Sequence, residues 1–342
     1  MEEHKRRKRY SGTHPVRFED KYKELDPEKY RDDVEKIIES GKTPAGMHIP
    51  IMVDEILEVL DIKPGENGFD ATLGYGGHTE KMLEKLEGKG HIYATDVDPV
   101  ESEKTKNRLA AKGYGADVFT LVRTNFCNVD SIVPPEKFDF FLADLGVSSM
   151  QIDNPERGFT FKYDGPLDLR LDPSSGEPAS ERLKEMSRDE IEGMLTENSD
   201  EPFAGRIADE IIKTFKKGEK IETTKQLAAV IEKAVSGSLR DPDEIKKSCQ
   251  RTFQALRIDV NSEFEVLYEL LEKIPGVMNP GGRIAILTFH SGEDRLVKKA
   301  FKQYFKDGVF SSISEEPVRA SKEEYFRNSR SHSAKLRWAV MA

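Results

Sequence analysis

Helical and strand-like hydrophobic patterns alternate through the first half of the chain. Apolar residues recur at helical spacing in residues 53–60, and further helices are predicted at about 79–87 and 100–112. Short, mostly apolar runs typical of buried strands accompany them, at 68–73, 91–96, 118–122 and 138–144. Strands that alternate with helices indicate βαβ units and a parallel sheet. Nearly continuous apolar strands agree, because both faces of such a sheet are covered.

A long stretch without strand patterns follows Asp144. Residues 178–236 show helical spacing only, and the βα pattern resumes with a helix around 264–274 and a strand at 283–289. Neither half could close a sheet alone, so we expect one α/β domain with an all-helical insert. The predicted division is a polar N-terminal extension (1–45), a first core part (46–150), a helical insert (151–257), and a second core part with a basic C-terminal tail (258–342).

Composition excludes several classes of protein. Hydrophobic residues make up 37% of the 342 residues and arrive in periodic clusters, which excludes disorder of the whole chain. No run approaches the roughly 18 apolar residues of a membrane span, and no apolar stretch follows the basic residues 5–9. Two cysteines exclude a disulfide framework or a zinc ribbon. We therefore expect a cytoplasmic protein.

The net charge of −10 is unevenly distributed. Residues 1–31 hold ten Lys or Arg against seven Asp or Glu, residues 213–257 hold eleven against six, and residues 317–342 hold six against two. Basic islands on an acidic body are compatible with local phosphate contacts. They are equally compatible with solvated helix faces, so charge alone does not identify a nucleic-acid partner.

A glycine cluster at 74–77 lies between a predicted strand and a predicted helix, where the backbone can approach a ligand closely. Asp96 ends the next strand, twenty residues beyond Gly76, at the spacing of a carboxylate that binds ribose hydroxyls. The plainer alternative is a tight strand–helix connection. Thr79 breaks the G-x-G-x-x-G pattern of NAD enzymes, and a Pro-Gly-Gly turn at 280–282 precedes the late strand. Both features favour S-adenosylmethionine as the cofactor.

Asp144 ends the fourth predicted strand, at the carboxyl edge where open α/β sheets bind ligands. An amino group conjugated to a nucleobase is a poor nucleophile, because its lone pair is drawn into the ring. A carboxylate that accepts its N–H bonds restores electron density and aims the lone pair at a methyl donor. Asp144 is therefore the candidate catalytic residue, and the plainer alternative is a strand-end cap.

Several separate blocks together give a specific resemblance. They are Gly74–His78, Asp144–Ser149, Asp153 with Glu156–Phe159, Gly165–Arg170, Arg251–Arg257, and Phe289–Ser291 with Glu293–Arg295. In this order they resemble the ribosomal RNA small subunit methyltransferase H family (RsmH/MraW), from about His48 to Trp338. The resemblance implies a Rossmann-like methyltransferase core with an inserted helical substrate domain. It also implies methylation of the 4-amino group of a cytidine in the decoding region of 16S rRNA, with S-adenosyl-L-methionine as donor.

The resemblance also assigns site residues. The family's cofactor positions fall on Gly76, Gly77, His78, Asp96, Phe126, Asp144 and Gln151. It suggests Asp96 for the ribose, Phe126 for the adenine face, and Asp144 and Gln151 for the methionine end. His290 with Glu293 and Asp294 suggests a polar helix start rather than a metal site, so no metal is expected.

The chain departs from the family pattern at both ends. The first 45 residues are extra, and the stretch after Phe310 is short, although residues 327–337 resemble the family's closing motif. Two alternatives stay open: a methyltransferase of another amine in RNA, DNA or protein, and a non-catalytic ribosome assembly factor that kept the fold. The expected partner is 16S rRNA in the small subunit, without a membrane, and the oligomeric state stays open.

Overall fold

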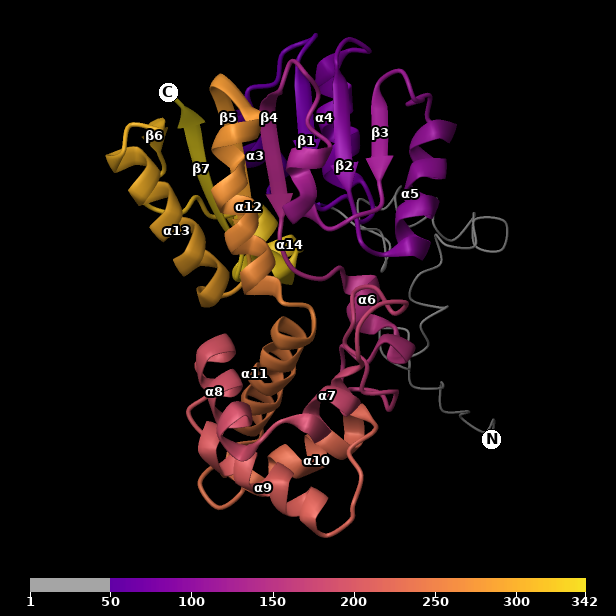
Figure 1. The fold of residues 1–342 in the computed structure, drawn as a ribbon, viewed down its shortest axis with the longest axis vertical. Coiled ribbons are helices and arrows are strands. Elements are labelled where there is room, and N and C mark those ends of the chain that lie inside the picture. The colour runs from indigo at the N-terminus through magenta and orange to yellow at the C-terminus, as the bar shows by residue number, and fades with distance from the viewer. Residues whose placement is uncertain (1–49) are drawn as a thin grey trace, which may run out of the picture. The chain divides into compact units, whose positions relative to one another are not determined.

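The computed structural model describes residues 50–342 and shows an α/β fold built on one sheet of seven strands (Figure 1). The strand order is β3-β2-β1-β4-β5-β7-β6, with β7 antiparallel to both of its neighbours and the other pairs parallel. The strands are β1 (Asn67–Asp70), β2 (His91–Thr95), β3 (Phe119–Val122), β4 (Phe138–Asp144), β5 (Met278–Thr288), β6 (Phe310–Ile313) and β7 (Lys335–Met341). The predicted parallel sheet is confirmed for β1 to β5, and the predicted N-terminal extension lies outside the described residues.

Alternate side chains of β4 enter the two cores that cover the sheet. Phe140 and Leu142 join a cluster on the side of α3 and α4, whereas Phe141 and Ala143 join a cluster with α12 and α13. This period of two is the geometry of a strand buried on both faces. The helices of the α/β part of the chain are α3 (Val53–Leu60), α4 (Gly77–Leu86), α5 (Pro99–Ala111), η2 (Phe126–Ser131), α12 (Glu263–Val277), α13 (Ser291–Lys306), α14 (Lys322–Arg327) and η4 (Ser329–His332).

Helices occupy the chain between β4 and β5. They surround a third core, which includes Leu183, Ile207, Ile231 and Leu256, all at most 1% exposed. In the described chain from 145 to 277, the β-type pairing is a single bridge between Pro166 and Thr223. The elements are α6 (Ser149–Asp153), η3 (Pro155–Arg157), α7 (Ala179–Glu185), α8 (Arg188–Ser199), α9 (Ala204–Lys216), α10 (Thr224–Val235) and α11 (Pro242–Val260).

The C-terminal part of the sheet differs from the sequence pattern. Strand β5 begins at Met278 rather than near 283, because Met278 still pairs with Phe138 across a register irregularity. Strands β6 and β7 were not predicted, and Lys335 and Arg337 of the expected basic tail lie within β7. Arg337 is buried because its Nε donates to Asp294 Oδ1 at 2.6 Å. None of the helices described between residues 50 and 342 is long and apolar enough to span a bilayer.

Candidate active site

Close packing of the backbone shapes the glycine loop between β1 and α4. Gly76 precedes α4 with a φ of 66°, and a Cβ there would lie 2.7 Å from Thr105 Cγ2. A Cβ on Gly77 would lie 3.0 Å from Pro50 Cγ. Thr105 Oγ1 donates to the Gly74 carbonyl at 2.7 Å, which fixes the loop against α5. The first turn of α4 has backbone N–H groups without helical partners, so this edge offers donors to a ligand.

Asp96 follows β2 and holds the same loop. Its Oδ2 accepts from the Gly74 N–H at 2.8 Å, and its Oδ1 accepts from the Asp98 N–H at 2.8 Å. Burial raises the pKa of Asp96 to about 6, although these two N–H groups act in the opposite direction. Each carboxylate oxygen keeps a second lone pair, so the ionised side chain can accept two further hydroxyl hydrogens.

His78 and Asp144 meet at the carboxyl end of β4. His78 Nδ1 lies 3.3 Å from Asp144 Oδ2, and His78 Nε2 lies 2.9 Å from the Ile51 carbonyl. Burial lowers the pKa of His78, but the hydrogen bond and charge of Asp144 outweigh it, and the pKa is raised overall. Asp144 N–H donates to Thr72 Oγ1 at 2.7 Å, which fixes the end of the strand.

One oxygen of Asp144 has no partner among the described residues. Asp144 Oδ1 is buried and accepts no hydrogen bond there. A buried acceptor without a donor is costly, and in native proteins such atoms are usually completed by water or a ligand. Gly146 follows with a φ of 102°, and a Cβ there would lie 3.6 Å from Phe289. The arrangement therefore fits a ligand that brings a hydrogen-bond donor to Asp144.

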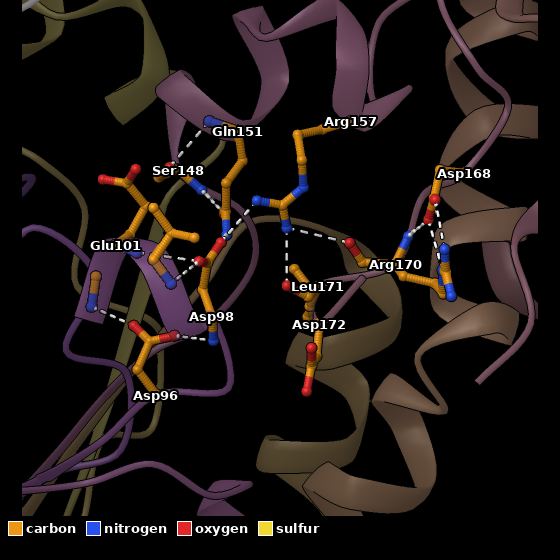
Figure 2. Close-up of polar contacts among 12 residues, drawn as sticks. Asp96, Asp98, Glu101, Ser148, Gln151, Arg157, Asp168, Arg170, Leu171 and Asp172 are labelled. Carbon is orange, nitrogen blue, oxygen red and sulfur yellow. Dashed lines mark hydrogen bonds and ion pairs between the residues drawn. The ribbon is translucent and has the colours of Figure 1, made fainter. Parts of the chain in front are cut away.

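Asp98 connects this site to the residues after β4, as Figure 2 shows. Its Oδ1 accepts from the N–H groups of Val100 and Glu101 and so caps α5. Its Oδ2 accepts from Arg157 Nη1 at 2.7 Å and from Gln151 Nε2 at 3.3 Å. Burial raises the pKa of Asp98, but the hydrogen bonds from Arg157 and from the capping N–H groups lower it by more. The pKa of Asp98 is therefore below its ordinary value.

Gln151 and Arg157 extend the network in two directions. Gln151 Oε1 accepts from the Ser148 N–H at 2.9 Å, which ties α6 to the loop after β4. Arg157 Nη2 donates to the carbonyls of Arg170 and Leu171 at 3.2 and 2.8 Å (Figure 2). One buried carboxylate thus joins the β2–α5 loop to two segments that lie far along the chain.

The remaining motif residues have structural partners. Arg170 forms two bonds with Asp168, at 2.8 and 2.7 Å. A Cβ on Gly158 would lie 2.3 Å from the Pro166 carbonyl, and one on Gly165 would lie 2.1 Å from the Pro155 carbonyl. Two of the sequence blocks therefore pack backbone against backbone, which only glycine permits at these positions.

Phe126 is placed separately from this network. It begins η2 after β3, where it is half-buried and packs against the core that contains Ala71 and Val129. The other six predicted positions lie close to one another: Gly76, Gly77, His78, Asp96, Asp144 and Gln151. His78 contacts Asp144 directly. Asp96 binds the glycine loop through the Gly74 N–H, and Asp98 contacts both Asp96 and Gln151. Asp98 and Arg157 were not predicted as site residues; the signal for Asp98 is its place before Pro99, which is typical of a helix cap.

The predicted polar start of α13 is confirmed. His290 and Glu293 form the capping box of this helix, and Asp294 binds Lys335 and Arg337 instead. Ligand atoms of Glu263, His290 and Glu293 lie within 4.8 Å of one another, which is compatible with a metal ion. Arg257 donates two bonds to Glu263, at 2.8 and 2.9 Å, so this acidic group already has a cation beside it. The expected absence of a metal stays a prediction.

The mixed sheet and the polar groups at the ends of β2 and β4 are those of an S-adenosylmethionine-dependent methyltransferase with a Rossmann-like fold. Residues 45–341 match the MraW methylase family. The chain belongs to this family, as the full-length similarity to its relatives also indicates.

Curated relatives cover nearly the whole chain. The chain is 61% identical to "Ribosomal RNA small subunit methyltransferase H 1" of Agathobacter rectalis, over 99% of this chain and 98% of that protein. It is 57% identical to "Ribosomal RNA small subunit methyltransferase H 2" of Alkaliphilus metalliredigens, over 100% and 99%. A relative from Thioalkalivibrio sulfidiphilus is 39% identical and covers 88% of this chain and 98% of that protein. The alignments with the first two relatives therefore include the N-terminal extension, which lies outside the match to the family model.

Solved structures are more distant. TrmN from Thermus thermophilus gives a TM-score of 0.41 at 12% identity, over 85% of this chain and 48% of that chain. An rRNA methylase from Streptococcus thermophilus gives 0.38 at 15% identity, over 84% of this chain and 93% of that chain.

Proposed function

We propose that this protein methylates the exocyclic 4-amino group of a cytidine in the decoding region of 16S rRNA, in the cytoplasm. The observation that carries the proposal is the buried, unpartnered Oδ1 of Asp144 at the carboxyl end of β4. An amino group of a nucleobase supplies the N–H that this oxygen lacks. The names of the relatives, which specify small-subunit ribosomal RNA, support the choice of substrate.

The site residues fit S-adenosyl-L-methionine. Asp96 has lone pairs for the two ribose hydroxyls, and Phe126 is half-buried at the neighbouring strand end, where an aromatic face suits adenine. The loop at Gly76 and Gly77 and the side chain of Gln151 provide donors for the methionine end. When bound, the cofactor supplies an electrophilic methyl group.

Asp144 orients the amine in this proposal. Its Oδ1 accepts one N–H of the amino group, which fixes the direction of the nitrogen lone pair and returns electron density to the nitrogen. No strong base is needed before attack, because the nitrogen becomes acidic only as the methyl arrives. Holding the two reacting groups in line is therefore the larger contribution. His78 holds the other oxygen of Asp144 and so fixes the rotamer of the carboxylate.

The helical segment between β4 and β5 is the proposed substrate domain. A cytosine paired in a helix cannot present its amine to a buried site, so the base must be unstacked or already single-stranded. Exposed lysines on α9 and α10, including Lys213 and Lys233, can neutralise phosphates that flank it. Both of these lysines lie beside Glu210, so part of their charge is already balanced within the protein.

Nucleoside mass spectrometry of 16S rRNA from a deletion strain tests the proposal. We expect N4-methylcytidine to be lost from the decoding region, and to return with the wild-type gene but not with Asp144→Ala. Unchanged 16S rRNA together with a modified nucleoside missing elsewhere would indicate another amine as the substrate. Cofactor binding with no missing methyl group in RNA, DNA or protein would indicate an assembly factor.

A further inference from the structure

An aromatic surface on α14 has no role in the site described above. Phe326 is 86% exposed, the largest value among the large apolar side chains whose exposure the structure describes. Tyr325 lies beside it, 47% exposed, with ring centroids 6.1 Å apart and nearly perpendicular planes. The Tyr325 ring stacks on His332 at 3.8 Å and 19°. We call Tyr325, Phe326 and His332 the α14 aromatic surface.

Hydrogen bonds fix this surface to the protein. His332 Nε2 lies 2.7 Å from the Tyr325 carbonyl, which holds the stacked ring in place. In the same helix, both oxygens of Glu324 accept from the Met52 N–H, at 2.9 and 3.1 Å. The Ser321 N–H donates to Glu55 Oε1 at 3.0 Å. The start of α14 is therefore bonded to α3 and to the residue that precedes α3. Phe326 is therefore exposed on a helix that hydrogen bonds hold against the rest of the protein.

The anchor places the surface next to the candidate active site. Met52, which binds Glu324, directly follows Ile51, whose carbonyl contacts His78 Nε2 at 2.9 Å. His78 in turn contacts Asp144. Figure 1 shows α14 at the end of the sheet where β4 ends, in agreement with these contacts. A short chain of contacts therefore connects α14 with Asp144.

Charge favours a polyanionic partner. Arg319, Lys322 and Arg330 are exposed on the same stretch of chain. The acids between residues 317 and 332 are Glu323 and Glu324, and Glu324 is used in the anchor. Exposed aromatic rings among cations are the usual means by which proteins bind single-stranded nucleic acid, since each base has a face that can stack. A single exposed ring is smaller than the apolar patches that usually mark a protein–protein interaction site.

We propose that the α14 aromatic surface binds an unpaired segment of the substrate RNA, with one base stacked on Phe326 beside the nucleotide that enters the Asp144 site. The inference rests on the proposed function, because it assigns a second contact to the same RNA. Aromatic side chains commonly hold the unstacked bases of single-stranded RNA in this way. The surface would keep the strand open next to the target.

Substitutions at Phe326 test the stacking in the full-length protein. We expect Phe326→Ala to weaken binding to undermethylated 30S subunits about 5- to 100-fold, the range of one base–aromatic stack. Phe326→Leu should behave like Ala, because it keeps the apolar area but not the ring, and Phe326→Trp should bind like the wild type. Affinity for S-adenosylmethionine should be unchanged in all three, which shows that the fold and cofactor site are intact. Phe305→Ala, at an exposed ring on α13, is the matched control.

Two results would overturn the inference while leaving the proposed function in place. One is wild-type affinity and methylation in Phe326→Ala. The other is wild-type affinity in Phe326→Leu, which would indicate an apolar contact with protein instead of a stacked base. If the wild-type enzyme binds 30S subunits but methylates no cytidine, the proposed function fails instead.

A photo-crosslinking residue identifies the occupant directly. With p-benzoylphenylalanine at position 326 in the full chain, irradiation in the presence of 30S subunits should give a crosslink to 16S rRNA. A crosslink to residues 1–49 of the same chain, or to a ribosomal protein, would contradict the RNA assignment.

Discussion

His78 Nδ1 lies 3.3 Å from Asp144 Oδ2, so the start of α4 and the end of β4 meet through a buried imidazole and a carboxylate. Asp144 raises the pKa of His78 against the effect of burial, which favours a protonated ring. The pair leaves Asp144 Oδ1 buried and without a partner among the described residues. In the proposed function, His78 holds one oxygen of Asp144 and the substrate amine binds the other.

Substitution of Asp144 should reduce turnover in two steps. Asp144→Asn keeps the shape and an acceptor, and we expect single-turnover methyl transfer to 30S subunits to fall about 10-fold. Asp144→Ala loses both, and a fall of about 100- to 1000-fold is expected, comparable to the loss of one positioned electrostatic group. Both proteins should remain folded by circular dichroism. A wild-type rate in Asp144→Ala would mean that Asp144 is only a strand cap.

Asp96 should make cofactor binding depend on pH. Because its pKa is raised to about 6, the ionised form that accepts two hydroxyls is gained between pH 5 and 7, and affinity for S-adenosylmethionine should rise over this window. The contribution to folding has the opposite sign: it is fully present below the ordinary pKa and is lost as pH rises through about 6. Calorimetry of wild type and Asp96→Asn checks this, since the variant should lack this part of the rise.

Removal of the Asp96 side chain gives a simpler measurement. Asp96→Ala should cost roughly 1.5–3 kcal/mol of cofactor binding, typical of a charged hydrogen bond. Unchanged affinity in a folded Asp96→Ala protein would contradict the assignment of Asp96 to the ribose.

Loss of the Arg157–Asp98 ion pair should destabilise the protein and weaken cofactor binding together. Arg157→Gln leaves the buried carboxylate of Asp98 without its cation, so we expect a loss of about 2–4 kcal/mol in the free energy of unfolding. Affinity for S-adenosylmethionine should fall as well, because the Asp98 carboxylate also accepts from Gln151 and the Asp98 N–H donates to Asp96 Oδ1.

The matched control is Arg182→Gln. It breaks an ion pair with Asp259 in which the arginine side chain is 47% exposed, and such pairs contribute about 0–1 kcal/mol. Equal losses in the two variants, measured by urea denaturation, would show that the Asp98 pair has no special role.

Neutralisation of Lys213, Lys216 and Lys217 should weaken RNA binding and flatten its salt dependence. Each phosphate contact releases counterions, so the slope of log affinity against log salt should decrease by up to about 2 units. Cofactor affinity should not change. The control replaces Lys81, Lys85 and Lys89, which are exposed around α4. If affinity and slope are the same in both triple variants, the α9 lysines are a solvated face.

The sequence was sufficient for the parts of the fold that depend on local patterns. Strands β1 to β4 are short apolar runs between helices, and both the glycine loop and Asp96 stand at a spacing set by one βα unit. Strand β7 escaped prediction because it carries Lys335 and Arg337, whose charges are balanced by Asp294 about forty residues earlier in the chain.

The same limit applies to the site. Asp98 and Arg157 are 59 residues apart, and nothing near either residue indicates that they form a buried pair. The partner of His78 was likewise hidden, because Asp144 lies at the end of the third strand after it in the chain. Roles that depend on one residue and its neighbours can be predicted from sequence, whereas pairs that form only across the fold need the coordinates.

The order of strands in the sheet has a consequence for how the chain folds. Strands β4 and β5 are hydrogen-bonded neighbours, yet residues 145–277 separate them in the chain. Contacts of such long sequence separation form slowly, because the conformational entropy of the intervening loop is lost before the new hydrogen bonds stabilise the pair. During synthesis β4 is an unpaired edge, in addition to the permanent edge strand β3, until the helices and then β5 have been made. That exposed edge makes the half-built sheet the stage at which aggregation competes with folding.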